Sequence, residues 1–510
     1  MINVPGNYTP YADKRYIQTE ATFELIDVDA AEQAEVTTSA ELPFSKKNQT
    51  IDKTVHMSQK VATAELGEWV LNGTYAPVSL VGDNEEVGYW SEALSDLSGN
   101  IDVTLTFEFS ASVSSKAITV IFDDATGNCG ENFILKAYDS NNTLINSTTI
   151  TGNNSSVVIV DMTAENYKKI VLNITKTNKP YRHVRVCEVL FGYLKIFTDD
   201  DIVSAIFEYD SSIYSESFPS NKMTLTIDNT DRRYNIINPA GIYKFLQKGQ
   251  GLNGSVVINN SRIIMGRFYF NSSSSDDNSM TVKIIAYDKA YSLDNIPCTI
   301  GQSGSWTMNE AVAAVISNSG LNIVTAIPEA IGVRVVGKAF PNNASCREAL
   351  RLIAQAAMCV CYFNRFDELE FREQGIETFV DSLNNDNMSS YPGITDTGLI
   401  NSIIITAKDE YSKTENTYTA QDVGEGEEKK VLNINNPLVL SNDVAQWVLS
   451  RTKYRIRYAV SEQGNPAREL QDVINIADVY GENKNGLVIK ETFTSSIGLI
   501  GSIEAVTKFE

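Results

Sequence analysis

The stretch Leu225–Leu252, LTIDNTDRRYNIINPAGIYKFLQKGQGL, decides how the rest of the chain is interpreted. Asp228 and Asp231 lie at the end of an alternating, strand-like run, and two arginines follow directly. Aspartates at such a place could hold a metal, but the adjacent cations would compete for the carboxylates. Asx side chains at strand ends also bond to their own backbone. The stretch therefore predicts an ion-paired turn of a β-sheet and not a catalytic or metal-binding loop.

Runs of the same kind recur along the chain and are rich in Val, Ile, Thr and aromatic residues, with Asn, Gly and Ser between them. This alternation is typical of half-buried strands in barrels and sandwiches. The sequence therefore predicts a mainly β fold with minor α. The clearest runs are residues 21–28, 103–113, 117–122, 223–229, 280–288 and 400–409.

Three segments change to a helical period. Thr307 followed by Glu310, and Ser345 followed by Glu348, are capping-box pairs that each precede an apolar stripe. Gly320 is placed to end the first of these helices. A third helix is predicted from about Ser441, and a strand pair, CVCYFNRFDELEFRE, follows the second helix.

The length of 510 residues requires several domains. We assign residues 1–62 plus 198–295 to a first barrel, because the strands before residue 62 lack enough partners to close a sheet alone. Residues 63–197 are assigned to an inserted β-sandwich, residues 296–374 to a small mixed α/β domain, and residues 375–510 to a second barrel with one helix.

The formal charge of −22 would repel a phosphate backbone, so duplex DNA binding is not expected to be the main task. The first 17 residues contain no apolar core of a signal peptide, and no run of about 18 apolar residues could span a membrane. The six cysteines lack the spacing of a zinc site, and we interpret them as buried thiols of a chain made in a reducing cytoplasm.

The segment DDATGNCGEN, residues 123–132, follows an apolar strand and gathers oxygen ligands. Asp123, Asp124, Glu131 and Asn132 could hold a calcium ion, although Asp, Asn and Gly are also the residues that tight turns require. The turn is the favoured interpretation. No cofactor is therefore predicted, and calcium in the inserted sandwich is the alternative.

Tyr89 and Trp90 lie in VGYWSEAL, where they could stack on a sugar ring or belong to the core, and the sequence leaves both open. Neither His56 nor His183 lies in a G-x-S-x-G or comparable context, and no phosphate-binding glycine loop occurs. The chain is therefore predicted not to be an enzyme. Carboxylate-only chemistry, as in glycosidases, remains an alternative.

Two regions resemble the baseplate hub proteins of phage and prophage tails and of phage-derived contractile bacteriocins. The opening stretch, with IIMGRFYF (263–270) and KIIAYDKAYSLDN (283–295), resembles the first hub barrel. Residues 432–506, with NPLV, GNP and LQDVI, are similar to the closing region that completes a second barrel. The resemblance covers about 300 residues as a pattern of whole segments.

The inserted unit has a resemblance of its own. YWSEALSD (89–96) and PYRHVRVCEVLFG (180–192) are similar to galactose-binding-like, discoidin-type sandwiches, which often bind carbohydrates. This resemblance implies a possible glycan partner for the insert.

The hub resemblance implies a homotrimer in which two tube-like barrels per chain present six positions to a hexameric tail tube or distal tail protein. The opposite face would meet a threefold central spike, and a tape-measure protein would be a further partner. The implied location is the baseplate of a virion or tail-like particle. Phage and bacteriocin, and contractile and non-contractile tails, stay open. The alternatives are a tail protein that binds bacterial-surface glycans and a cell-wall hydrolase.

Overall fold

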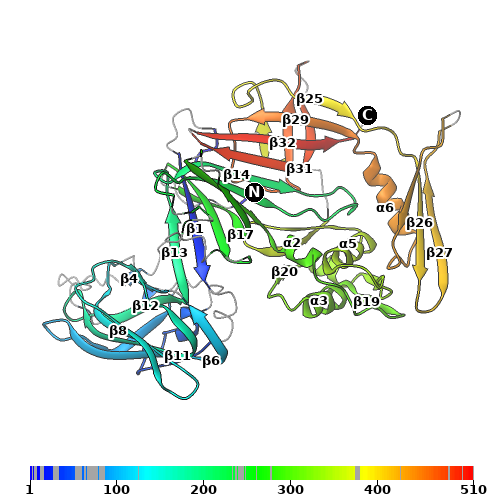
Figure 1. Cartoon of the computed structure of the whole chain (residues 1–510). Coiled ribbons are helices and arrows are strands. Elements are labelled where there is room, and N and C mark those ends of the chain that lie inside the picture. The colour runs from blue at the N-terminus through cyan, green and yellow to red at the C-terminus, as the bar shows by residue number, and fades with distance from the viewer. Residues whose placement is uncertain are drawn as a thin grey trace. The chain divides into compact units, whose positions relative to one another are not determined.

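The computed structural model describes the chain except residues 3, 5–7, 12–16, 27–33, 52–59, 62–64, 66–77, 80–86, 116, 124–125, 233, 236–237, 239–245, 247, 260, 276–277, 279, 374–378, 425–426, 480–482, 497 and 509–510. The chain forms two compact units (Figure 1). Unit 1 contains residues 1–21, 197–243 and 251–510, and unit 2 contains residues 22–196 and 244–250. Most described residues in regular elements lie in strands, which confirms the mainly β class.

One sheet dominates unit 1 and takes strands from both ends of the chain. Its strands alternate between buried and more exposed residues, as a sheet with one packed face requires. In hydrogen-bonded order they are β13 (Gly192–Phe197), β1 (Ile17–Ile26), β16 (Gly251–Ile258), β17 (Ser261–Ser275), β18 (Thr281–Tyr287), β15 (Lys222–Asp228), β14 (Ile202–Asp210), β31 (Asn483–Ser495), β32 (Leu499–Thr507), β29 (Ile456–Glu462) and β25 (Gly393–Asp396). In addition, β30 (Val473–Ala477) pairs with β31 and with β24 (Asp381–Leu383).

The N-terminal and C-terminal strand groups are joined directly through β14 and β31. These strands run antiparallel from the pair Ala205 and Ser495 to the pair Asp210 and Lys490. Phe207 of β14 lies opposite Phe493 of β31, and both rings are fully buried. Each such ring contributes about 1.5–3 kcal/mol through burial. The two regions that we assigned to separate barrels therefore share one continuous sheet.

The middle of unit 1 packs short strands against helices. Thr307 and Glu310 form the expected capping box at the start of α3 (Met308–Ser319), and Gly320 ends that helix with a φ of 68°. Ser345 caps α5 (Cys346–Ala356). The other elements here are α2 (Lys289–Asp294), β19 (Ser305–Thr307), β20 (Val324–Ala326), α4 (Glu329–Gly332), β21 (Val335–Gly337), β22 (Val360–Phe363) and β23 (Glu368–Arg372).

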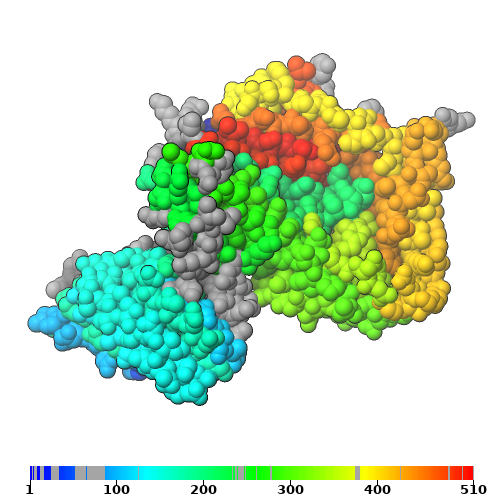
Figure 2. All heavy atoms as spheres, viewed as in Figure 1, coloured from blue at the N-terminus to red at the C-terminus, as the bar shows by residue number. Residues whose placement is uncertain are grey.

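A three-stranded sheet and the last helix share the core of this α/β region. The sheet contains β26 (Ser402–Asp409), β27 (Thr414–Gln421) and β28 (Val431–Asn435), and α6 (Asp443–Thr452) follows it. Phe371, Ile405 and Val448 belong to one buried cluster, and Figure 2 shows the orange residues lying directly against the yellow-green ones. The domain boundary at residue 374 stays a prediction, and buried side chains on both sides of it pack together.

Unit 2 is a β-sandwich of two sheets around one aromatic core. The first sheet has the order β2 (Ala34–Thr38), β6 (Asn100–Ser115), β11 (Ala164–Thr177), β8 (Gly130–Tyr138) and β9 (Leu144–Ile150). The second has the order β10 (Val157–Val160), β7 (Ile118–Phe122), β12 (His183–Leu190) and β5 (Tyr89–Leu94). The remaining elements are η1 (Lys47–Thr50) and the pair β3 (Lys60–Val61) and β4 (Val78–Ser79).

The position of strand β2 differs from our domain assignment, which placed residues 1–62 in the first barrel. It pairs with β6 of the sandwich, where Val36 lies opposite Phe107 and both side chains enter the sandwich core. Burial of this apolar face therefore places β2 in the sandwich, although the two strands lie far apart in the sequence.

Candidate functional site

Arg185 of β12 forms a buried charge centre in the sandwich. Its guanidinium stacks on the Trp90 ring, 3.8 Å from the ring centroid, and pairs with the carboxylates of Glu65 and Asp123. The Nη1–Oδ2 distance to Asp123 is 2.5 Å. Because two carboxylates surround one cation that water does not reach, this centre is a structural ion-pair network.

The calcium candidates are occupied by other partners. Asp123 accepts hydrogen bonds from Arg185 and from the Thr126 hydroxyl, and Glu131 pairs with Lys176 at 2.8 Å. Asn132 accepts a hydrogen bond from the Gly152 amide at 3.0 Å. Asp124 lies outside the described residues. Among the residues that the structure describes, no group of three or more His, Cys, Asp and Glu side chains is placed to hold a metal.

Tyr89 and Trp90 lie in the core, which is one of the two positions that the sequence left open. Trp90 is 1% exposed and packs edge-on against Phe44, and its indole N–H donates to the Val87 carbonyl. Tyr89 is fully buried, and burial raises its pKa above the usual range. A sugar on the surface could not stack on either ring.

The structure brings three loops together beside the Arg185 centre. The Lys179 ammonium donates to the Thr126 carbonyl at 2.8 Å, the Asn178 amide donates to the Gly127 carbonyl at 3.0 Å, and the Arg182 N–H donates to the Ser95 hydroxyl at 3.0 Å. Residues 95–99, 126–128 and 178–182 therefore form one fastened loop cluster, which we call the sandwich loop cluster.

Two apolar side chains of the sandwich loop cluster face solvent. Leu97 is 73% exposed, and Tyr181 is 39% exposed with a φ of 52°. The Tyr181 N–H donates to the Asp96 carbonyl, which ties the two loops that carry these side chains. Our sequence analysis missed both residues. The available signal was an apolar residue within each of two polar turns, SDLSG and NKPYR.

One of the two histidines lies among the described residues, inside the sandwich. His183 is buried, its Nδ1 lies 2.8 Å from the Ser91 carbonyl oxygen, and burial lowers its pKa below the usual value. His56 lies outside the described residues.

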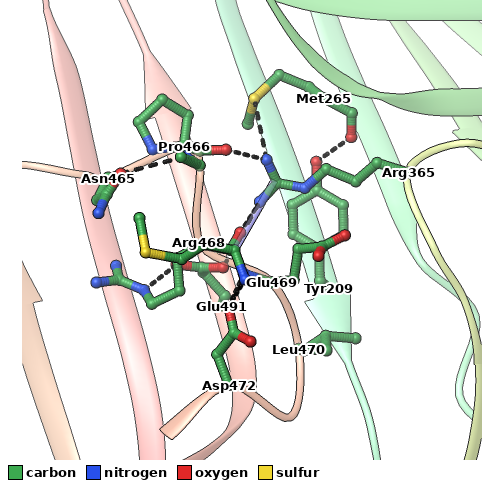
Figure 3. A network of polar contacts seen from close by, with 12 residues as sticks. Tyr209, Met265, Arg365, Asn465, Pro466, Arg468, Glu469, Leu470, Asp472 and Glu491 are labelled. Carbon is green, nitrogen blue, oxygen red and sulfur yellow. Dashed lines mark hydrogen bonds and ion pairs between the residues drawn. The ribbon is translucent and has the colours of Figure 1, made fainter. Parts of the chain in front are cut away.

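A second buried charge centre lies in unit 1 and surrounds Arg468 (Figure 3). Its Nε donates to Glu491 at 2.7 Å, Nη2 to Glu462 at 2.5 Å, and Nη1 to Asp381 at 2.6 Å. Tyr11 also donates its hydroxyl proton to Asp381 at 2.7 Å. The arginine therefore joins β24, β29 and β31 to the N-terminal segment, and its partners range from 6 residues away at Glu462 to 457 residues away at Tyr11.

Arg365, from the turn between β22 and β23, extends this centre. Its guanidinium donates to the carbonyls of Pro466 and Arg468, lies 3.7 Å from Glu491, and stacks over the Tyr209 ring at 4.8 Å (Figure 3). The α/β region is thereby tied to both halves of the large sheet. We call these two arginines with Asp381, Glu462 and Glu491 the Arg468 network.

The opening stretch contains the predicted turn directly after β15, where the Arg232 N–H donates to the Asn229 carbonyl at 2.9 Å. The Asn229 side chain is buried and accepts a hydrogen bond from the Tyr234 N–H at 3.1 Å. It also donates a hydrogen bond to the side-chain oxygen of Asn235 at 2.6 Å. Asp228 is exposed and accepts a hydrogen bond from the Thr230 hydroxyl at 2.9 Å. The expected ion pairing stays a prediction, because Arg233 lies outside the described residues.

No protein-family model and no curated protein matches this chain. The structure is similar to a 43 kDa tail protein of prophage MuSo2 from Shewanella oneidensis, with 17% identity and a TM-score of 0.42 over 61% of this chain and 95% of that protein. It is also similar to the E. coli c3393 protein, a type VI secretion component described as similar to T4 tail proteins gp27 and gp5. That match has 11% identity and a TM-score of 0.36 over 61% of this chain and 74% of that protein.

A separate part of the chain matches sugar-binding modules. One is a fucose-binding module from Streptococcus pneumoniae, with 9% identity and a TM-score of 0.21 over 33% of this chain and 94% of that module. The similarities are to tail proteins and to carbohydrate-binding modules. The described residues contain no helix that is long and apolar enough to cross a membrane.

Proposed function

We propose that the chain is a structural hub of a phage tail or of a phage-tail-like particle. The observation that carries this proposal is the β14–β31 pairing, which makes one continuous sheet from the two regions whose sequences resemble the two hub barrels. The Arg468 network supports it, because its buried charges fasten β24, β29 and β31 to one another. The chain is made in the cytoplasm and then enters the baseplate.

In this proposal three copies form a ring. Each copy contributes two barrel regions, so that six positions meet a hexameric tail tube or distal tail protein and the threefold face meets a central spike. A tape-measure protein contacts the same assembly. Pairing of exposed strand edges between copies would cover edges that otherwise favour aggregation.

Mass photometry of the purified full chain, alone and with the tube and spike proteins encoded beside it, tests this assembly. We expect a species at three times the chain mass of 56.3 kDa, or a larger complex that contains three copies. A chain that stays monomeric both alone and with the tube and spike proteins would contradict the proposal.

The sandwich is proposed to bind a glycan of the bacterial surface. The sandwich loop cluster supports this, because Tyr181 and Leu97 offer exposed apolar surface beside the polar groups of Lys179 and Asp96. A sugar ring presents an apolar C–H face and polar hydroxyls, and an aromatic ring with adjacent polar groups matches both.

A glycan array with the full chain tests the sandwich. Loss of a stacking contact of about 1.5 kcal/mol weakens binding about tenfold, so Tyr181→Ala should lose that much affinity for any glycan that binds. Leu144→Ala removes a side chain with 50% exposure from β9 and serves as the matched control. Equal affinity of both variants would place the glycan elsewhere.

The chain is proposed to act without catalysis. Incubation with purified cell walls is expected to release no reducing ends and no muropeptides. Release of either product at a rate that depends on this chain would favour the hydrolase instead.

A further inference from the structure

Two cysteines of the α/β region are held side by side by the backbone. A β-bridge joins Pro297 to Ser345, and the flanking amides complete it. The Cys298 N–H donates to the Ala344 carbonyl at 2.9 Å, and the Cys346 N–H donates to the Ile296 carbonyl at 2.7 Å. Cys298 and Cys346 therefore occupy diagonal positions across one short antiparallel contact.

Both side chains are buried in the same cluster, and the two thiols differ in chemical character. The neighbouring Cys346 thiol raises the pKa of Cys298, and the neighbouring Cys298 thiol lowers the pKa of Cys346 to about 7. The Cys346 S–H donates to the Pro297 carbonyl at 3.8 Å. Cys346 is the first residue of the eleven-residue helix α5, whose N-terminus favours negative charge. The Asn318 side-chain amide donates to the Cys346 sulfur at 3.4 Å, and this bond also favours the thiolate.

A surface cavity lies beside Asn318, the residue whose amide contacts Cys346. It has a volume of about 510 Å³ and is lined by Thr299 and Trp306 on one side and by Ser317 and Asn318 of α3 on the other. Asn318 lies between the cavity and Cys346, and it also accepts the hydroxyl and N–H hydrogen bonds of Thr299. A shift of this one amide would expose the Cys346 sulfur to a small molecule in the cavity.

We propose that Cys298 and Cys346 are an oxidation-sensitive dithiol that closes to an intramolecular disulfide when the chain meets a peroxide. The Cys346 thiolate attacks one peroxide oxygen, so that the O–O bond breaks, a sulfenic acid forms at Cys346, and hydroxide leaves. The Cys298 sulfur then attacks the Cys346 sulfur and displaces the sulfenic oxygen, which leaves as water with the Cys298 proton. Overall, two thiols lose two electrons and the peroxide is reduced to water.

The disulfide would fasten the segment after α2 to the start of α5. Such a link persists outside a reducing cytoplasm. The inference does not depend on the proposed hub function, because it rests on the contacts of these two residues alone.

The chain contains a matched control pair. Cys359 directly precedes β22, and Cys361 is the second residue of that strand. Both side chains are buried, and Val360 alone separates them. Burial raises the pKa of Cys361 to about 12, so its thiol stays protonated and unreactive. Peroxide should therefore spare this pair.

The test treats the full chain with hydrogen peroxide, unfolds it in the presence of N-ethylmaleimide, and measures the intact mass. Alkylation is expected to fall from six sites to four, and a reductant should restore all six. Peptide mapping should find a Cys298–Cys346 cross-link. Retention of six alkylated thiols, a cross-link between other cysteines, or over-oxidation of Cys346 without a cross-link would overturn the proposal.

Two variants separate the steps. In Cys298→Ser the second step is blocked, so a sulfenic acid should remain at Cys346 and react with dimedone. Cys361→Ser should form the cross-link as the unmodified chain does. If either variant fails to fold, the cross-link of the unmodified chain still decides, because that measurement needs no substitution.

Discussion

Replacement of Arg468 by methionine should destabilise unit 1 more than any surface charge change. The Arg468 guanidinium is fully buried and bonds to three carboxylates. In Arg468→Met these three carboxylates would lie close together without the positive charge between them. Arg365 stays near Glu491 at 3.7 Å, which leaves Glu462 and Asp381 without a cation. Removal of one partner from a buried ion pair costs about 3–5 kcal/mol.

Urea unfolding, followed by tryptophan fluorescence or circular dichroism, measures this loss. With a slope of about 3 kcal/mol per molar urea, the midpoint for unit 1 should fall by about 1 M or more. Arg457→Met is the matched control, because Arg457 pairs with Glu504 at 3.0 Å and its side chain is 42% exposed. A pair of that kind contributes about 1 kcal/mol or less.

A charge-balanced variant separates lost pairing from lost packing. Arg468→Met combined with Glu462→Met and Asp381→Leu removes the two carboxylates that the single substitution leaves without a cation, and it should recover much of the lost stability. If Arg468→Met and Arg457→Met shift the midpoint equally, the Arg468 network does not hold the halves of the sheet together.

Two further predictions concern the same network. Burial raises the pKa of Glu491 from 4.5 to about 7, so its contribution to stability is complete below pH 4.5 and is lost as pH rises through 7. In Glu491→Gln the urea midpoint should therefore fall less between about pH 5 and pH 8 than in the unmodified chain. An unchanged slope of midpoint against pH would assign the fall to other groups. Gly501→Ala would place a Cβ against the Glu462 carboxylate, whereas Gly498→Ala meets no atom within 4 Å, so thermal unfolding should show a loss of about 1–3 kcal/mol for the first alone. Equal melting of both glycine variants would show that Glu462 can move aside.

The parts of the fold that depend on local pattern could be predicted from the sequence. The alternating runs gave strands, and Thr307 with Glu310 gave a capping box that the structure contains. The Asn-rich turn after β15 was also predicted from residue chemistry. These features are local, because their atoms are brought together by backbone geometry within a few residues.

The parts that depend on distant pairing could not be predicted. Arg185 and Glu65 are 120 positions apart, and Arg468 and Asp381 are 87 apart, so no spacing rule indicates either pair. Strand β2 joined the sandwich because Val36 completes a core whose other residues follow much later. For Trp90 the sequence left surface and core open, and the contact with Arg185 shows why an aromatic residue is needed in the core.

Immuno-electron microscopy of tail-like particles from cells that express this chain with an epitope tag tests the central claim most directly. The account predicts label at one end of each tail, where tube and spike meet, and particles that carry the chain after purification. Label along the whole tube, or particles that lack the chain while it remains in the free protein fraction, would contradict a hub.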